Sequence, residues 1–238
     1  MIELRKTLTI SAIIPAYNEQ DNIANVIRSV KKRKEIDEII VVDDGSTDAT
    51  VKVVKQFGIN VISNKKNSGK GSAMKLGASH ATGDVLLFLD ADLKNINSDK
   101  IKLMIEPFRH MVDFVKTRFD RNAGRVTLLT AKPLLEHFFP DVAKRFEQPL
   151  SGQIGIKKEI LDKIPLEQDY GVDVGILIDV VEMGVKTEEV DFGYLEHDEK
   201  NLEELDMMAR QVAGVILGRA GKYDRLKDKP SIINSQYA

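Results

Sequence analysis

Two aspartates spaced two residues apart, Asp90 and Asp92, follow a short apolar run near the middle of this chain. The run, residues 86–89, is typical of a strand buried on both faces, and the carboxylates come where such a strand would leave its sheet. In extended backbone, residues i and i+2 point to the same side, so both carboxylates could bind one hard cation. Mg²⁺ usually takes one or two protein carboxylates together with substrate phosphate oxygens. Capping of the next helix, or plain solvent exposure, is the alternative interpretation of the pair.

A polar, basic loop that contains glycine spans residues 64–71 and opens a predicted helix. Its backbone N–H groups and the positive end of the helix dipole suit a phosphate group. Lys70 lies between Gly69 and Gly71, and a lysine there can neutralise the charge of a diphosphate. The glycine spacing and the missing Lys-Ser/Thr pair exclude a P-loop. Plain solvation of the lysine is the alternative.

Carboxylates also follow the other predicted strands of the first half, at Glu19 and at Asp43 with Asp44, and Asp173 is a further candidate. In a doubly wound sheet, the carboxyl ends of the strands meet at one edge, where ligands bind. Asp43 taken singly fits a helix cap as well as a ligand contact. Three successive acidic strand ends, with a basic glycine loop between the second and the third, predict a site for a nucleotide and a metal ion.

Among the histidines, His197 is the candidate metal ligand. It follows a predicted strand, and a neutral imidazole there could join Asp92 on the cation. His80 and His110 fall in predicted helices, which favours surface positions or satisfied core positions. The sequence contains no Gly-x-Ser-x-Gly motif and no recognisable serine–histidine–carboxylate triad.

Strands and helices alternate over residues 8–92, which predicts an α/β fold with a mostly parallel sheet flanked by helices. The predicted strands are residues 8–14, 36–42, 59–63, 86–89, 112–116 and 185–192, and a loop at 149–156 leads into one more. The predicted helices include residues 23–30, 51–57, 72–81, 98–110, 126–139, 170–183 and 201–219. Pro15 should end the first strand, Asp21 or a neighbour should cap the first helix, and Ser46 should cap the second.

The composition narrows the class of protein. The chain has 238 residues, of which 42% are apolar, so it can build one large domain or a domain with an appendage. A net charge of −2 gives no sign of nucleic-acid binding, and the absence of cysteine excludes disulfides and thiol catalysis. No apolar run reaches the ~20 residues of a membrane span, and the amino terminus lacks a signal-peptide core. These features predict a soluble cytoplasmic protein without an integral membrane segment.

Several motifs resemble those of known enzymes. Residues 15–19 (PAYNE), 42–48 (VDDGSTD), 69–71 (GKG) and 89–93 (LDADL) resemble the nucleotide-sugar half of GT-A glycosyltransferases. Residues 124–127, 132–135, 148–152, 170–175 and 177–179 are similar to the corresponding segments of glucosyl-3-phosphoglycerate synthases, which are retaining enzymes of this fold. The resemblance covers most of residues 8–219. It implies one continuous, Rossmann-like GT-A domain, with a nucleotide-sugar half at 1–95 and a smaller acceptor-binding half, including the C-terminal helix, at 96–238.

The resemblance also implies roles for individual residues. The uridine would contact Ala16, Tyr17, Glu19 and Asp44; the diphosphate and ribose would lie near Gly69, Lys70, Asp90 and Ala91; and the donor sugar would border Leu150, Ser151, Gly152 and Asp173. The metal, Mg²⁺ or Mn²⁺, would be bound by Asp92 and His197. Asp92, Lys70 and Asp173 would form the catalytic set. A small phosphorylated acceptor would bind at Gly124, Arg125, Val126 and Thr127, where an arginine, backbone N–H groups and a hydroxyl suit a phosphate.

This sequence departs from the family pattern at three positions. The family often has glutamate where this chain has Asp173, and it usually has arginine and asparagine where this chain has Leu195 and Glu199. The expected reaction is metal-dependent transfer of a hexose, with glucose favoured, from a nucleoside-diphosphate sugar to 3-phosphoglycerate. The metal and Lys70 would stabilise the leaving diphosphate. Family resemblance implies front-face attack, in which a leaving phosphate oxygen takes the acceptor proton and no side-chain nucleophile is required.

Three rival functions remain open at this point. An inverting transferase with another acceptor, such as a polyprenyl phosphate, would use Asp169 or Asp173 as general base. A nucleotidyltransferase would also pair a metal with a basic loop, but it would release pyrophosphate. A binding module without turnover would bind the nucleotide sugar and leave it unchanged.

The predicted C-terminal helix, residues 201–219, has a long apolar stripe. The stripe is made of Leu202, Leu205, Met208, Val212 and Val215, after a capping-box start at Asn201 and Glu204. We expect part of this stripe to pack against a second subunit and form a homodimer. The alternative is that the whole helix packs on its own domain.

Overall fold

The computed structural model describes residues 8–120, 124–196 and 201–226. Within these ranges, seven strands form one sheet in the order β3–β2–β1–β4–β6–β5–β7. The strands are β1 Ile10–Ala16, β2 Glu38–Asp43, β3 Val61–Ser63, β4 Val85–Phe88, β5 Phe114–Arg118, β6 Ile154–Lys157 and β7 Thr187–Asp191. Four pairings are parallel, namely β1 with β2, β1 with β4, β2 with β3, and β5 with β7. Strand β6 runs antiparallel to both β4 and β5. The predicted α/β architecture is therefore confirmed.

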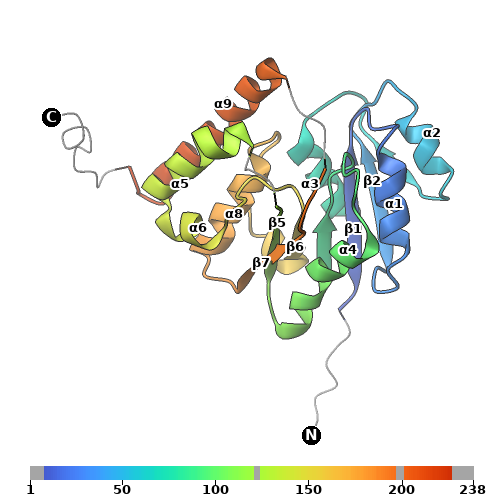
Figure 1. Cartoon of the computed structure of the whole chain (residues 1–238), viewed down its shortest axis with the longest axis horizontal. Coiled ribbons are helices and arrows are strands. Elements are labelled where there is room, and N and C mark those ends of the chain that lie inside the picture. The colour runs from blue at the N-terminus through green and yellow to red at the C-terminus, as the bar shows by residue number, and fades with distance from the viewer. Residues whose placement is uncertain (1–7, 121–123, 197–200, 227–238) are drawn as a thin grey trace, which may run out of the picture.

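Helices cover both faces of this sheet (Figure 1). In chain order they are α1 Ile23–Lys31, α2 Thr50–Lys55, α3 Lys70–His80, α4 Ser98–Ile105, the 3₁₀ turn η1 Glu106–His110, the π-helical turn η2 Thr127–Ala131, α5 Lys132–Phe138, α6 Pro140–Arg145, α7 Lys158–Leu161, α8 Val172–Glu182 and α9 Leu202–Lys222. Helices α1 and α2 lie at one side of the molecule, and α5, α6, α8 and α9 gather at the other. None of these helices is long and apolar enough to cross a membrane.

The core is divided by the sheet into two apolar clusters. Successive side chains of β1 alternate between them: Ile13 joins the cluster under α3, α5, α8 and α9, whereas Ala12 and Ile14 join the one under α1 and α4. All three side chains are fully buried. This double burial explains why central strands such as β4, Val85–Phe88, are apolar along their whole length.

Five local predictions were wrong. Strand β1 continues through Pro15 to Ala16, because β4 pairs with it only as far as Ile13 and the missing proline N–H is not needed there. Helix α1 has no side-chain cap from Asp21 or its neighbour Asn22. Helix α2 begins only at Thr50, where Asp48 rather than Ser46 accepts the backbone N–H.

The fourth concerns the acidic pair, and the fifth concerns the stripe on the last helix. Strand β4 ends at Phe88, so Asp90 follows it in an irregular segment and Asp92 lies in a turn, not in the continuous extended backbone that we expected. In α9 the capping box of Asn201 and Glu204 is confirmed. Leu202, however, is 73% exposed and does not belong to the packed stripe, because the first turn of the helix extends beyond the core.

Candidate active site

The carboxyl ends of β1, β2 and β4 open onto one cavity of about 710 Å³. Segments far apart in the sequence meet around it, including the loop before α3, the loop before β6, the start of α8 and one face of α9. Of the predicted site residues, those that line it are Ala16, Tyr17, Glu19, Asp44, Gly69, Lys70, Asp90, Ala91, Asp92, Leu150, Ser151, Gly152 and Asp173. Every residue that we expected to bind the donor thus borders the same space.

Lys70 is the centre of the charge arrangement in this cavity. Its Nζ lies 2.7 Å from Asp90 Oδ1 and 2.8 Å from Asp173 Oδ2. Burial by itself would lower the pKa of this lysine, but the two carboxylates outweigh burial and raise it above its usual value. Lys70 therefore stays protonated at any ordinary pH, and its fixed positive charge suits a diphosphate.

The start of α3 is fixed in place by close backbone packing. Gly69 precedes the helix with a φ of +98°, and a side chain there would collide with the carbonyl oxygen of Gln168. Ser72 N donates to that same carbonyl at 2.9 Å. The sequence Gly-Lys-Gly thus gives the loop before α8 room to pack directly against the turn that carries Lys70.

Asp90 is bound from two sides. Besides its ion pair with Lys70, it accepts a hydrogen bond through Oδ2 from Gln153 Nε2 at 2.8 Å. A Cβ atom on Gly152 would overlap both the Asp90 carboxylate and Lys70 Nζ. The loop before β6 therefore passes directly over the ion pair, and only glycine fits at this point.

Asp173, in the first turn of α8, is almost completely buried, with 4% of its surface exposed. Burial raises its pKa, and the nearby Lys70 and Lys116 cations oppose this effect. Its Oδ1 has no hydrogen-bond partner among the described residues. A buried acceptor beside a cavity is costly unless a ligand supplies a donor, and a sugar hydroxyl is such a donor.

Asp44 fastens the loop that carries Lys70. Its Oδ2 accepts from the backbone N–H groups of Ser68 at 3.0 Å and Gly69 at 2.8 Å, and its Oδ1 accepts from Asn64 Nδ2 at 2.7 Å. The carboxylate is 3% exposed. Its observed partners are thus internal, and the predicted contact with uridine stays a prediction.

The loop after β1 holds a flat aromatic side chain at the mouth of the cavity. Tyr17 is 43% exposed and lines the opening. The next residue, Asn18, has a φ of +56°; its N–H donates to Ser46 Oγ and its side-chain oxygen accepts from Thr47 N. These bonds fix the loop after β1 against the loop after β2, so Tyr17 is in a position to stack on a base.

Of the two predicted metal ligands, the structure describes only one. Asp92 lines the cavity beside Asp90, whereas His197 lies outside the described residues. No three histidine, aspartate or glutamate side chains of the described part come together as a metal-binding group. Carboxylates outnumber the single lysine, Lys70, among the described residues that line the cavity. Asp92 in such a lining fits Mg²⁺ or Mn²⁺, because these ions prefer hard oxygen ligands and take much of their coordination from phosphate oxygens and water.

The predicted acceptor residues lie apart from the others. Gly124 and Arg125 are exposed at the start of a helical segment, whereas Val126 and Thr127 are buried, and none of the four lines the cavity. The turn η2 that follows packs against α9. Helix α9 in turn contributes cavity-lining side chains, namely Glu204, Met207, Met208, Gln211 and Val212. The acceptor segment therefore leads into a turn that packs on a helix of the cavity wall, but it does not line the cavity itself.

Sequence reasoning missed several residues at this site. Gln153 binds Asp90, Lys116 lies behind the cavity wall, and Gln211 of α9 has a buried side-chain oxygen without a partner among the described residues. Leu195, where the family usually has arginine, is 2% exposed and belongs to a core cluster while also bordering the cavity. No local signal marks Gln153 or Lys116, because each acts through a contact with an element distant in sequence.

Comparisons with known proteins identify a family for the part of the chain that forms much of this cavity. A family model described as glycosyl transferase family 2 matches residues 11–158, which include β1 to β6 and the loops that carry Lys70, Asp90 and Asp92. This chain belongs to glycosyltransferase family 2.

Relatives of this family 2 chain cover nearly its whole length. It is 32% identical over 240 residues to the glucosyl-3-phosphoglycerate synthase of Mycolicibacterium paratuberculosis, spanning 90% of this chain and 73% of the relative. A crystal structure of the Mycobacterium tuberculosis synthase with Mn²⁺, UDP-glucose and phosphoglyceric acid is similar with a TM-score of 0.84 and 34% identity, covering 90% of this chain and 80% of that one. The same synthase with Mg²⁺ and UDP gives a TM-score of 0.85 over the same shares, again at 34% identity.

Proposed function

We propose that this glycosyltransferase moves glucose from UDP-glucose to 3-phosphoglycerate with retention of configuration, and that it needs Mg²⁺ or Mn²⁺. One observation carries the proposal: every residue expected to bind the donor borders one cavity, with Lys70 bridging Asp90 and Asp173 at its centre. The relatives, which are synthases crystallised with UDP-glucose and phosphoglyceric acid, support the choice of donor and acceptor.

The donor end follows from the positions of the lining residues. Tyr17 stacks on the uracil ring at the mouth of the cavity, and Ala16, Glu19 and Asp44 surround the nucleoside. The diphosphate lies against Lys70, whose charge stabilises the negative charge that develops on the leaving group. Asp92 and His197 hold the metal ion, which when bound adds Lewis-acid stabilisation of the same diphosphate.

The glucose ring lies between the loop Leu150–Gly152 and the start of α8. Here Asp173 Oδ1, buried and without a partner, accepts a hydroxyl hydrogen bond. The same carboxylate is ion-paired to Lys70 through Oδ2, so this oxygen is already engaged and does not face an acceptor hydroxyl as a free base. That pairing favours the retaining route, in which a leaving phosphate oxygen takes the acceptor proton, over an inverting route with Asp173 as base.

The acceptor phosphate binds at Gly124 to Thr127. Arg125 is exposed at the start of this segment, where backbone N–H groups and a guanidinium suit a phosphate. The acceptor reaches the sugar past α9, whose Met207 and Met208 border the cavity. Leu195 in place of the family arginine leaves Arg125 as the principal cation of the described part for this phosphate.

The molecule divides by function into two halves within one continuous domain. Residues 1–95 bind the nucleotide sugar, and residues 96–238, which include α9, supply the acceptor side.

The enzyme is cytoplasmic and forms a homodimer. Exposed apolar side chains on α9 and η2, such as Leu217 and Leu129, favour this assembly. Light scattering at micromolar concentration tests this assembly, since a one-chain mass would contradict it.

The experiment that tests the function is a matrix of donors and acceptors. UDP- and GDP-sugars are offered with 3-phosphoglycerate, glycerol 3-phosphate and a polyprenyl phosphate, each with Mg²⁺, Mn²⁺ or a chelator. We expect UDP and an α-linked glucosyl phosphoglycerate, by NMR, only when metal is present. Release of pyrophosphate would indicate a nucleotidyltransferase, a β-linked product would indicate inversion, and binding without turnover would indicate a binding module.

A further inference from the structure

Lys116 is a lysine whose side chain is completely enclosed. It lies in β5, has no exposed surface, and does not line the cavity. Its Nζ donates a hydrogen bond of 2.7 Å to the carbonyl oxygen of Ser151. Burying an ammonium group costs free energy. A completely buried lysine that does not line the cavity is therefore expected to have a structural role, such as holding a neighbouring loop in position.

The charges around Lys116 do not form a simple salt bridge. Within the described ranges, no carboxylate lies within ion-pair distance of its Nζ. The groups that face it are Asp173 on α8, Glu189 on β7, Asp90 after β4 and the like charge of Lys70 on α3. Burial dominates over these and lowers the pKa of Lys116 to about 8. The hydrogen bond to Ser151 is therefore its principal direct contact.

Ser151 is held from both faces of β5. Lys116 and Thr117 are adjacent in the strand, so their side chains leave on opposite sides. Thr117 Oγ1 lies 3.3 Å from Ser151 Oγ and 3.3 Å from the carbonyl oxygen of Gln153. The loop before β6 thus surrounds the end of β5 and is fixed at its carbonyl by Lys116 and at its side chain by Thr117.

This fixed loop forms the wall that touches the catalytic charges. Gly152 follows Ser151 directly, and its α-carbon lies so close to Asp90 and Lys70 that no side chain fits. Gln153, the next residue, donates to Asp90. A shift at the Ser151 carbonyl would therefore move the wall against the Lys70 ion pair.

We propose that Lys116 is a positioning residue for the transfer reaction, which holds the Leu150–Gly152 wall of the donor-sugar pocket against Lys70 and Asp90. The inference rests on the proposed function, because that function places the transferred sugar against this wall. It predicts a selective effect: loss of Lys116 weakens the use of the sugar-bearing donor but leaves binding of the bare nucleoside diphosphate nearly unchanged. The nucleoside contacts lie on the loops after β1 and β2, which Lys116 does not touch.

The test replaces Lys116 with methionine, which has similar length but neither charge nor N–H donor. We expect kcat/KM for UDP-glucose to fall about 10- to 100-fold, as for a displacement of about 1 Å near the reacting groups. The dissociation constants of UDP and UDP-glucose are measured by calorimetry on the same preparation. That of UDP should change less than about 3-fold, whereas that of UDP-glucose should rise clearly more.

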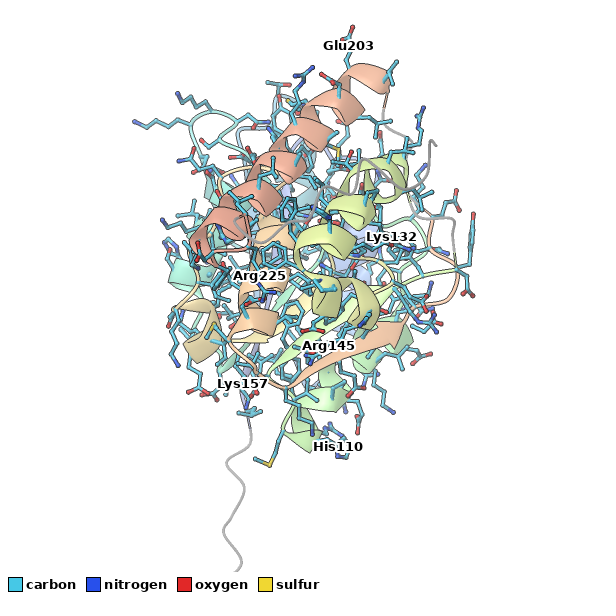
Figure 2. All side chains as sticks on the ribbon, turned by 90° about the vertical axis from the view of Figure 1, so that its left-hand side faces the viewer. His110, Lys132, Arg145, Lys157, Glu203 and Arg225 are labelled. Atoms are coloured by element: carbon cyan, nitrogen blue, oxygen red, sulfur yellow. The ribbon has the colours of Figure 1, made fainter. Side chains whose placement is uncertain are left out.

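The control is the same substitution on the neighbouring strand, Lys157→Met. Lys157 ends β6 and pairs with Asp113 at 2.6 Å. Figure 2 shows Lys157 at the end of the molecule that also carries His110, away from Glu203 at the start of α9. This variant should leave both nucleotide affinities and turnover unchanged.

Two further variants separate positioning from folding. Lys116→Gln keeps an N–H donor and should recover part of the lost donor use. If Lys116→Met does not fold, Thr117→Val removes the second contact to Ser151 and should give a smaller loss of the same selective kind. Equal weakening of UDP and UDP-glucose together with a lower Tm, or no change in either, would overturn the proposal. Because calorimetry needs no turnover, these outcomes are distinct from a failure of the proposed reaction.

Discussion

Two regions of the molecule carry residues predicted to bind substrate. One consists of the loops after β1, β2 and β4, and the other is the segment around η2; they differ in whether their residues line the cavity. The first set meets at one sheet edge and borders one cavity, as in the case of Tyr17, Asp44 and Asp92. The second set, from Gly124 to Thr127, does not line that cavity, and the turn η2 at its end packs against α9. Parallel strands bring their carboxyl ends together by topology alone, whereas the acceptor side depends on how helices pack on one another.

From this difference we expect substitutions at the carboxyl ends of the strands to lower the rate of the transfer reaction. Asp92→Asn removes one carboxylate charge at a partly exposed turn and should leave the fold intact. We expect metal-dependent turnover to fall at least about 100-fold, because the ion loses its ligand beside the diphosphate. A titration of activity against Mn²⁺, with Tm measured in parallel, checks this. Asp99→Asn, at the exposed start of α4, is the matched control. Near-normal activity of the Asp92 variant would remove the metal assignment.

Damage to the acceptor segment should instead separate the two substrates. Arg125→Ala removes a charge-assisted contact that contributes roughly 1.5–3 kcal/mol, so acceptor use should weaken about 10- to 150-fold. Donor affinity should stay nearly constant, and Arg125→Lys should recover only part, because a point charge lacks the planar fork of arginine.

The matched control for Arg125 is Arg145→Ala on α6, an exposed arginine labelled in Figure 2. Acceptor kinetics, donor affinity and Tm are measured on one preparation of each. A parallel loss of both substrates and of Tm would mean that Arg125 acts locally on the fold. An unaltered acceptor response would mean that the acceptor pocket lies elsewhere.

The buried Lys116 should make the free energy of unfolding depend on pH in the alkaline range. The pKa of Lys116 is lowered from 10.5 to about 8. Between about pH 8 and 10.5 the unfolded chain then binds more protons than the folded one, so folding becomes more favourable as the pH rises. Relative to Lys116→Met, the free energy of unfolding of the wild type should increase by up to about 3 kcal/mol between these two pH values. Urea unfolding of both proteins at several pH values measures the difference. A constant difference would show that Lys116 titrates at its ordinary pKa.

The smallest expected effect lies at the start of α9. Asn201 Oδ1 accepts a hydrogen bond from Glu204 N at 2.9 Å, and Glu204 Oε2 accepts one from Asn201 N at 3.1 Å. Asn201→Ala should cost about 1 kcal/mol of stability. Since Met207, one turn further on, lines the cavity, acceptor kinetics should suffer more than nucleotide binding. A stronger effect on UDP affinity than on the acceptor would contradict this division of the molecule.

The sheet edge could be predicted because its signals are local. Apolar runs such as residues 85–88 mark buried strands, and Lys70 between two glycines marks a backbone that must approach another segment closely. The details of the strand ends were less predictable: Pro15 remains in β1 because only one neighbour pairs with it there. Likewise, Asp90 turns toward Lys70 because Gln153 and Lys70 bind it, and neither contact leaves a trace in local spacing.

The sequence by itself determined the alternation of strands and helices, the chemistry of the loops and the family. These follow from side-chain periodicity and from residue types that only certain backbones and ligands accept. Tertiary structure decided which charges meet: Lys70 with Asp90 and Asp173, Lys116 with the Ser151 carbonyl, and α9 with the cavity. The side-chain contacts among these join residues that are 20, 35 and 103 positions apart, and such contacts depend on how elements pack rather than on any short stretch of chain.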